Sequence, residues 1–130
     1  MRTIVRLGLA GMLCAGLLSA ASPAMANDGD VIKEGRCSGA SSWKLKISPE
    51  NAGLEMEFEV DSNVVGQTWR YQMGYNGSLI AQGTAVTQAP SGSFEVRKVV
   101  ANQPGQDTLK ARAQNPATGE TCQGQVTANL

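Results

Sequence analysis

Four acidic residues alternate with apolar residues in one short segment of this chain. This acidic stripe consists of Glu55, Glu57, Glu59 and Asp61. On an extended strand, alternate residues share one face and lie about 6.5 to 7 Å apart. That spacing is close to the separation of the two carboxyl groups that inverting glycosidases use as acid and base. The stripe is therefore the first candidate for carboxylate chemistry.

A second interpretation of the stripe follows from the lysines that precede it. Lys44 and Lys46 alternate with apolar residues in the segment 41–48, which a short turn joins to 54–61. In a hairpin of these segments the lysines lie opposite the carboxylates, and such exposed pairs contribute less than about 1 kcal/mol each. We expect a solvated ion-paired face without catalytic, cofactor or metal sites, the alternative being a weak Ca²⁺ site that includes Asp61.

The residue inventory argues against catalysis more generally. The chain contains no histidine, so it lacks a side chain that titrates near neutrality unperturbed, an imidazole metal ligand and the base of a Ser-His-Asp or Cys-His arrangement. It also has no glycine-rich phosphate loop and no metal-spaced cysteine pair. We therefore expect that the protein is not an enzyme.

The first 26 residues have the composition of a cleavable export signal. Arg2 and Arg6 precede an apolar run, and the segment ends in Ala24-Met25-Ala26. The run is only about 15 residues long, whereas a membrane span needs about 20. We expect cleavage after Ala26, a secreted product and no stable membrane insertion afterwards.

Two of the three cysteines remain after cleavage, because Cys14 lies inside the apolar run. Exported proteins keep disulfides in their oxidising environment. We therefore predict a disulfide between Cys37 and Cys122, which ties the first strand, or the segment before it, to the last strand as neighbours along one sheet edge.

The remaining length suits one domain. Nine basic and eleven acidic residues follow Ala26. Because nucleic-acid binders rely on clustered basic residues, this balance argues against a nucleic-acid partner. We expect a monomer whose partner is an unidentified protein or cell-wall ligand.

Alternation with period two dominates the mature chain, and turn-forming residues interrupt it every 10 to 15 residues. This pattern predicts an all-β fold, a seven-stranded antiparallel immunoglobulin-like β-sandwich over 41–130 that follows a lead-in over 27–40. Asn76-Gly77 predicts a type I′ hairpin turn, and Gly83 predicts a bulge or a bend in the fourth strand. The seven predicted strands span residues 41–48, 54–61, 68–75, 78–87, 93–100, 108–114 and 121–128.

The seven-strand pattern, Trp69 on the third strand and the segment 104–113 resemble bacterial exported immunoglobulin-like domains. The segments 91–94 and 118–122 are similar to small secreted actinobacterial proteins of unknown function. The resemblance implies a sandwich with Trp69 in its core, and it implies no activity. Unlike antibody domains, the chain lacks cysteines on the second and sixth strands.

Two functional hypotheses remain. The first is a non-catalytic binding or envelope-associated module that uses end loops, where Val64 and Val65 are candidate surface contacts. The alternative is an inhibitor of an extracellular hydrolase, because Trp69-Arg70-Tyr71 is similar to the Trp-Arg-Tyr element of small streptomycete α-amylase inhibitors. The alternation places Trp69 and Tyr71 in the core and exposes Arg70, which is the third candidate contact.

Overall fold

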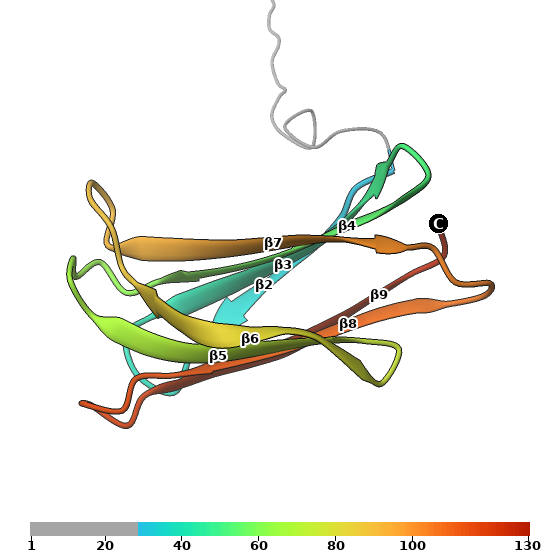
Figure 1. Ribbon diagram of the computed structural model, residues 1–130. Helices are drawn as coiled ribbons and strands as arrows, with labels where there is room; N and C mark the ends of the chain where they lie inside the picture. Colours follow the sequence, from blue (N-terminus) through green and yellow to red (C-terminus); the bar gives the residue numbers. More distant parts are fainter. Residues whose placement is uncertain (1–28) are drawn as a thin grey trace, which may run out of the picture.

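The computed structural model describes residues 29–130 as two four-stranded antiparallel sheets packed face to face (Figure 1). The first sheet contains, in spatial order, β2 (Val31–Arg36), β3 (Ser42–Glu50), β4 (Gly53–Asp61) and β7 (Ser93–Ala101). The second sheet contains β6 (Ser78–Val86), β5 (Thr68–Tyr75), β8 (Asp107–Gln114) and β9 (Thr121–Ala128). The predicted signal peptide, residues 1–26, lies outside the described residues.

The predicted all-β sandwich is confirmed, and each of the seven predicted strands is present. The strand count was wrong by one, because β2 forms within the predicted lead-in and pairs with β3. Its sequence lacks the apolar alternation of the other strands, since Lys33 and Gly35 stand opposite the core residues Leu45 and Trp43. Among residues 29–130, no helix is long and apolar enough to cross a membrane.

The hairpin between β5 and β6 turns at Asn76-Gly77, as predicted. Both residues have positive φ, 48° and 88°, which a type I′ turn requires. The irregularity in this hairpin is not at Gly83. The register shifts instead between Met73 and Gly74.

Aromatic rings from both sheets meet in the core. The ring of Phe94 on β7 lies 6.3 Å from that of Phe58, 6.4 Å from that of Trp69 and 6.2 Å from that of Tyr71. Trp69 is fully buried, as its place on the third predicted strand implied. Edge-to-face and tilted ring pairs of this kind stabilise a core beyond the area that they bury.

A second tryptophan occupies a slot made by two glycines. A Cβ atom added to Gly35 on β2 would lie 2.4 Å from the Trp43 ring, and one added to Gly124 on β9 would lie 2.3 Å from it. These distances are far shorter than a van der Waals contact. The Trp43 indole therefore packs directly against the backbone of the edge strands of both sheets.

The disulfide between Cys37 and Cys122 is present, but its predicted position along one sheet edge was wrong. Cys37 follows β2 in the first sheet, whereas Cys122 lies on β9 in the second. The bond therefore joins the two sheets. The backbone nitrogen of Ser38 also donates to the carbonyl of Thr121 at 2.8 Å, so the chain continues the link next to the disulfide.

Glu120 strengthens this junction. Its carboxylate accepts hydrogen bonds from the backbone nitrogens of Gly39 and Ser41, at 3.1 and 2.8 Å, and from the Ser41 hydroxyl at 2.9 Å. Charge-assisted bonds to backbone N–H groups are stronger than neutral ones. The loop between β2 and β3 is thus held against the turn before β9.

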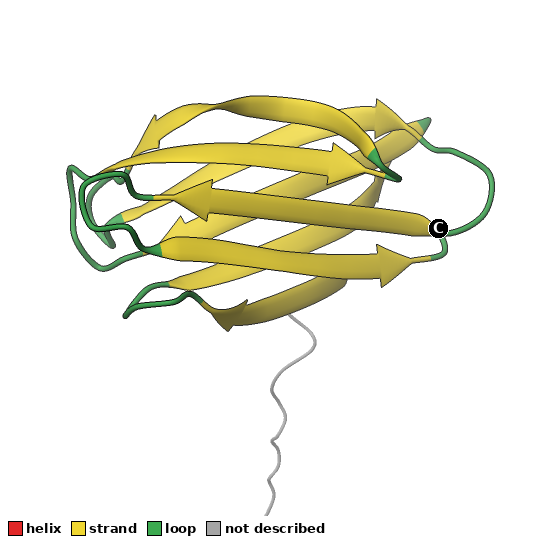
Figure 2. Cartoon of the chain, turned by 90° about the horizontal axis from the view of Figure 1, so that it is seen from below, coloured by secondary structure: helices red, strands yellow, loops and turns green. Residues whose placement is uncertain are grey.

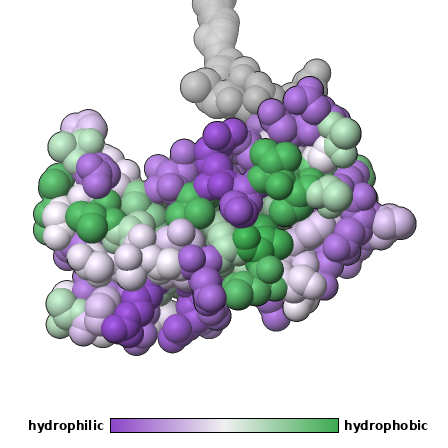
Figure 3. Space-filling view, viewed as in Figure 1, coloured by the Kyte–Doolittle hydropathy of each residue, from purple (hydrophilic) through white to green (hydrophobic). Residues whose placement is uncertain are grey.

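The opposite side of the sandwich carries the edge strands β6 and β7. A short connection joins them, with a bridge between Gln88 and Ser93. Figure 3 views this side, where hydrophobic residues (green) reach the surface between hydrophilic ones (purple). On these two strands, Leu79, Val86 and Val99 are 56%, 44% and 58% exposed.

One end of the sandwich is closed by a buried hydrogen-bond network. The Tyr75 hydroxyl donates to Asp107 Oδ1 at 2.7 Å, and the Gln103 nitrogen donates to the Tyr75 oxygen at 2.9 Å. The backbone nitrogen of Leu130 donates to Asp107 Oδ2 at 3.0 Å. Burial, together with the Asp107 carboxylate, raises the pKa of Tyr75 above its ordinary value, so the phenol keeps its proton near neutral pH.

Replacing Cys37 and Cys122 together by serine should lower the free energy of unfolding by about 4 kcal/mol, because the bond closes a loop with a sequence separation of 85. Urea denaturation of the variant and of the oxidised and reduced wild type measures the loss. A change below about 1 kcal/mol would show that the junction does not depend on the covalent link.

Gly124→Ala should cost about 1 to 3 kcal/mol of stability, because the new methyl group collides with the Trp43 ring. Gly74→Ala is the matched control, since its Cβ would meet its nearest neighbour at 3.4 Å. Urea denaturation compares the two. Equal losses would mean that the slot around Trp43 can widen freely.

Candidate functional site

The outer face of the first sheet carries the acidic stripe, and much of the stripe is buried. Lys46 Nζ lies 3.2 Å from Glu57 Oε1 and 3.9 Å from Glu55 Oε1, and Arg97 pairs with Glu55. The expected ion pairs across the hairpin are present, but the expectation of a solvated stripe was wrong for Glu55 and Glu57, which are 6% and 5% exposed. They lie on the interior strand β4, which has β3 on one side and β7 on the other, so long side chains from both neighbours lie beside them.

A pair of carboxyl groups lies in this face. Glu57 and Glu95 share a hydrogen bond, and this bond, followed by burial, raises the pKa of Glu95 to about 7. Burial alone would raise the pKa of Glu57, but the hydrogen bond from Glu95 and the nearby Lys46 lower it. One proton is therefore shared between the two groups, and Glu95 carries it under mildly acidic conditions.

A pKa raised in this way is also found in catalytic acids. The hollow on this face, about 410 Å³, is lined by other residues, including Glu34, Glu59 and Asp61, and not by the carboxyl pair. Among residues 29–130, no three His, Cys, Asp or Glu side chains are grouped as metal ligands. The pair is explained by packing of the sheet.

The outer face of the second sheet has the opposite chemistry. Its four strands contain five glutamines and three cationic residues, and their single acidic residue, Asp107, is buried. The strands of the first sheet contain no glutamine. We name this surface the glutamine face, and it comprises Arg70, Gln72, Gln82, Lys110, Arg112, Gln114, Gln123 and Gln125.

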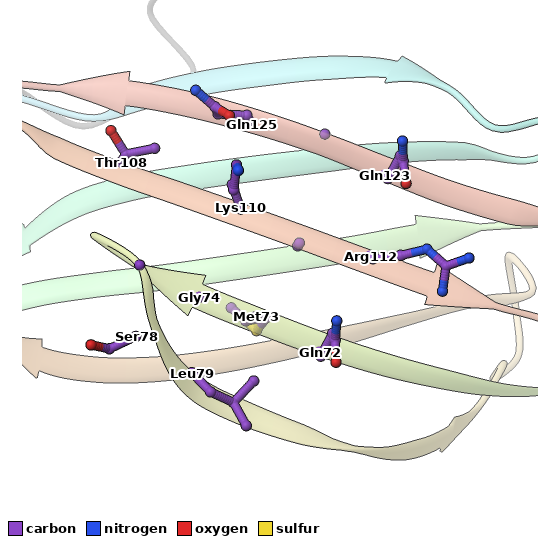
Figure 4. A pocket seen from close by; sticks show the side chains of 13 residues that line it. Gln72, Met73, Gly74, Ser78, Leu79, Thr108, Lys110, Arg112, Gln123 and Gln125 are labelled. Carbon is purple, nitrogen blue, oxygen red and sulfur yellow. The ribbon is translucent and has the colours of Figure 1, made fainter.

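The strand register aligns these side chains in rows across the sheet, which faces the viewer in Figure 2. One row contains Gln82, Gln72, Arg112 and Gln123 on four neighbouring strands. Lys110 and Gln125 belong to the next row, with Gly74 on β5. Figure 4 shows the labelled side chains of both rows standing on the same side of the sheet.

Two adjoining hollows cover the glutamine face. The larger, about 680 Å³, is lined by residues of both rows, with Gly74 leaving space beside Lys110. The smaller, about 520 Å³, includes Arg70, Gln82 and Gln114. Gln72 and Arg112 line both hollows, so the two form one shallow trough across the strands.

The cations and glutamines of this trough have no side-chain partners within the part of the chain that the structure describes. No side-chain hydrogen bond or ion pair engages the three cations or the five glutamines among residues 29–130. The nearest acid in sequence to β9, Glu120, is already bound to Gly39 and Ser41. The trough therefore offers donors, acceptors and positive charge to a ligand.

The structure separates the three predicted contact residues. Arg70 is exposed within the trough. Val64 and Val65, 50% and 54% exposed, lie in the loop before β5 and outside the trough. Thr87 holds this loop, because its hydroxyl donates to the Val64 carbonyl at 2.6 Å and accepts from the Gln67 nitrogen at 2.9 Å.

The Trp-Arg-Tyr triplet does not present its two rings together. Trp69 is fully buried, and its indole nitrogen donates to Gln67 at 3.3 Å. Tyr71 packs partly buried against Phe94. Only Arg70 is accessible, so the geometry does not favour a recognition element built from this triplet.

The glutamine face was missed at the level of sequence. Alternation alone places Gln72, Lys110, Arg112, Gln123 and Gln125 outward, and this signal was available. The sequence pattern does not reveal that β5, β8 and β9 are neighbours in one sheet. Strand neighbours are determined by contacts between residues that are far apart in the chain.

No family model matches the chain, and no curated protein or solved structure gives a significant match to it.

The shared proton gives a testable pH dependence. Because the folded-state pKa of Glu95 is raised from 4.5 to about 7, its stabilising effect is present below pH 4.5 and is lost as the pH rises to about 7. Urea denaturation between pH 5 and 8 should show this decline. Glu95→Gln, which keeps a hydrogen-bond donor, should flatten it.

Glu34→Gln removes a carboxylate from the same sheet without touching the pair, and it should keep the wild-type decline. If Glu95→Gln and Glu34→Gln behave alike, Glu95 is not the group that holds the proton.

Proposed function

We propose that this protein is a secreted, non-catalytic binding module that attaches to cell-envelope material through its glutamine face. The observation that carries the proposal is the segregation of polar side chains. All strand glutamines lie on one sheet, together with three cations and no accessible carboxylate, whereas the other sheet mixes its cations with carboxylates, so that Lys44, Lys46 and Arg97 form ion pairs.

The location outside the cell rests on two features. The disulfide between Cys37 and Cys122 is consistent with an oxidising compartment. The sequence of residues 1–26 has the composition of an export signal. A module released there meets the cell envelope first.

The absence of catalysis rests on composition and on the form of the trough. The chain has no histidine, and the trough contains no carboxylate that could act with its cations as an acid and base pair. Paired strands present its side chains, so the spacing of their backbone positions is fixed. Such a surface is suited to holding a ligand.

The proposal is tested by sedimentation with the insoluble envelope fraction of the organism that encodes the chain. Wild-type protein should pellet with this fraction, and the triple variant Arg70→Gln, Lys110→Gln and Arg112→Gln should lose about tenfold or more in affinity, because each exposed ionic contact contributes up to about fivefold.

The control removes three exposed cations from the first sheet: Lys33→Gln, Arg36→Gln and Lys98→Gln. It has the same net charge as the face variant and should bind like the wild type. Equal binding by all three proteins would refute the assignment of the glutamine face. A Val64→Ser and Val65→Ser variant tests the loop as the contact instead.

A further inference from the structure

We infer that the ligand of the glutamine face is an anionic polysaccharide, an inference that rests on the proposed function and narrows it to one ligand class. The three cations provide its charge recognition. Lys110 and Arg112 are two residues apart on β8, which separates them by about 6.5 to 7 Å. Arg70 on β5 is the diagonal neighbour of Arg112, about 7 to 8 Å away.

These cations form a bent row across two strands with similar spacings. An extended polymer with acidic groups along its length can place successive groups against them, and each further contact adds to the binding through the effective concentration of a linked site. Because Arg70, Lys110 and Arg112 have no carboxylate partner among residues 29–130, no internal ion pair must be broken first.

The glutamines indicate which uncharged groups the ligand has. A side-chain amide offers both donors and acceptors, which matches the hydroxyl groups of a sugar. Gln72 and Gln123 flank Arg112 on either side, and Gln125 flanks Lys110. Each of these two cations therefore has at least one amide beside it, as a charged and hydroxylated sugar unit requires.

The face lacks the features that other ligands need. The two tryptophans, two phenylalanines and Tyr75 are buried, and Tyr71 packs partly buried against the core. Tyr71 lines the smaller hollow, but it is the only aromatic residue at this face among residues 29–130, so the face has no series of rings to stack on nucleic-acid bases or neutral sugars. Protein interfaces need a well-packed apolar centre. Of the exposed large apolar residues among residues 29–130, only Leu79 lines the trough, and it does so from the edge strand β6.

The test is titration calorimetry of the oxidised mature chain with four polymers. Polygalacturonate and dextran sulfate are anionic polysaccharides, dextran is a neutral one and poly-L-glutamate is an acidic polypeptide. We expect binding to at least one anionic polysaccharide, at least about tenfold weaker in about 500 mM NaCl than in about 50 mM NaCl. Dextran should not bind, and poly-L-glutamate should bind at least about tenfold more weakly than the better anionic polysaccharide.

Variants then separate the roles of charge and amide. The triple variant Arg70→Gln, Lys110→Gln and Arg112→Gln should lose the salt-dependent binding, whereas the charge-matched control at Lys33, Arg36 and Lys98 keeps it. The double variant Gln72→Ala and Gln123→Ala should weaken binding about threefold to tenfold and leave the salt dependence unchanged.

Several results would overturn the inference. Binding of neither anionic polysaccharide, or equal binding of dextran, would exclude the ligand class, and tighter binding of poly-L-glutamate would assign the face to an acidic protein. A dimer of the free chain that the triple face variant abolishes would assign it to a second copy. If the face variant still fails to sediment with the envelope fraction while both anionic polysaccharides are inactive, the proposed function stands and only the ligand class falls.

Discussion

The two sheets are held in one relative position by the junction between β2 and β9, and both surfaces of the protein depend on it. A covalent bond joins Cys37 to Cys122 across the sheets, and the Trp43 indole fills the space beneath two glycines. Glu120 holds the adjoining loop with three hydrogen bonds. Since the other two edge strands are connected by a short turn, the sandwich is tied on both sides.

The two outer faces of the sandwich differ in the partners of their polar side chains. The first sheet mixes cations with carboxylates, so that Lys46 and Arg97 pair with the buried Glu55 and Glu57. The second sheet leaves its cations and amides unpaired among the described residues. Burying polar groups costs free energy unless they find partners. The buried carboxylates of the first face have such partners within the protein, whereas the cations of the second face remain exposed to solvent.

The sequence predicted the local features well and the non-local ones poorly. Alternation identified seven strands, Asn76-Gly77 located a hairpin, and the two mature cysteines gave the disulfide. The strand β2 was missed because Lys33 and Gly35 interrupt its pattern, and Gly35 is there to admit Trp43. The burial of Glu57 and the assembly of the glutamine face depend on strand neighbours, which local periodicity does not encode.

At Gly124, the backbone of β9 lies between the Trp43 ring and the trough. Gln123 and Gln125 point outward on either side of this residue, while the ring of Trp43 rests against its inner surface. Only one peptide backbone separates the indole from whatever occupies the trough. The intrinsic emission of Trp43, measured against the emission of the fully buried Trp69, thus gives an optical reporter of occupancy of the outer surface without any attached dye.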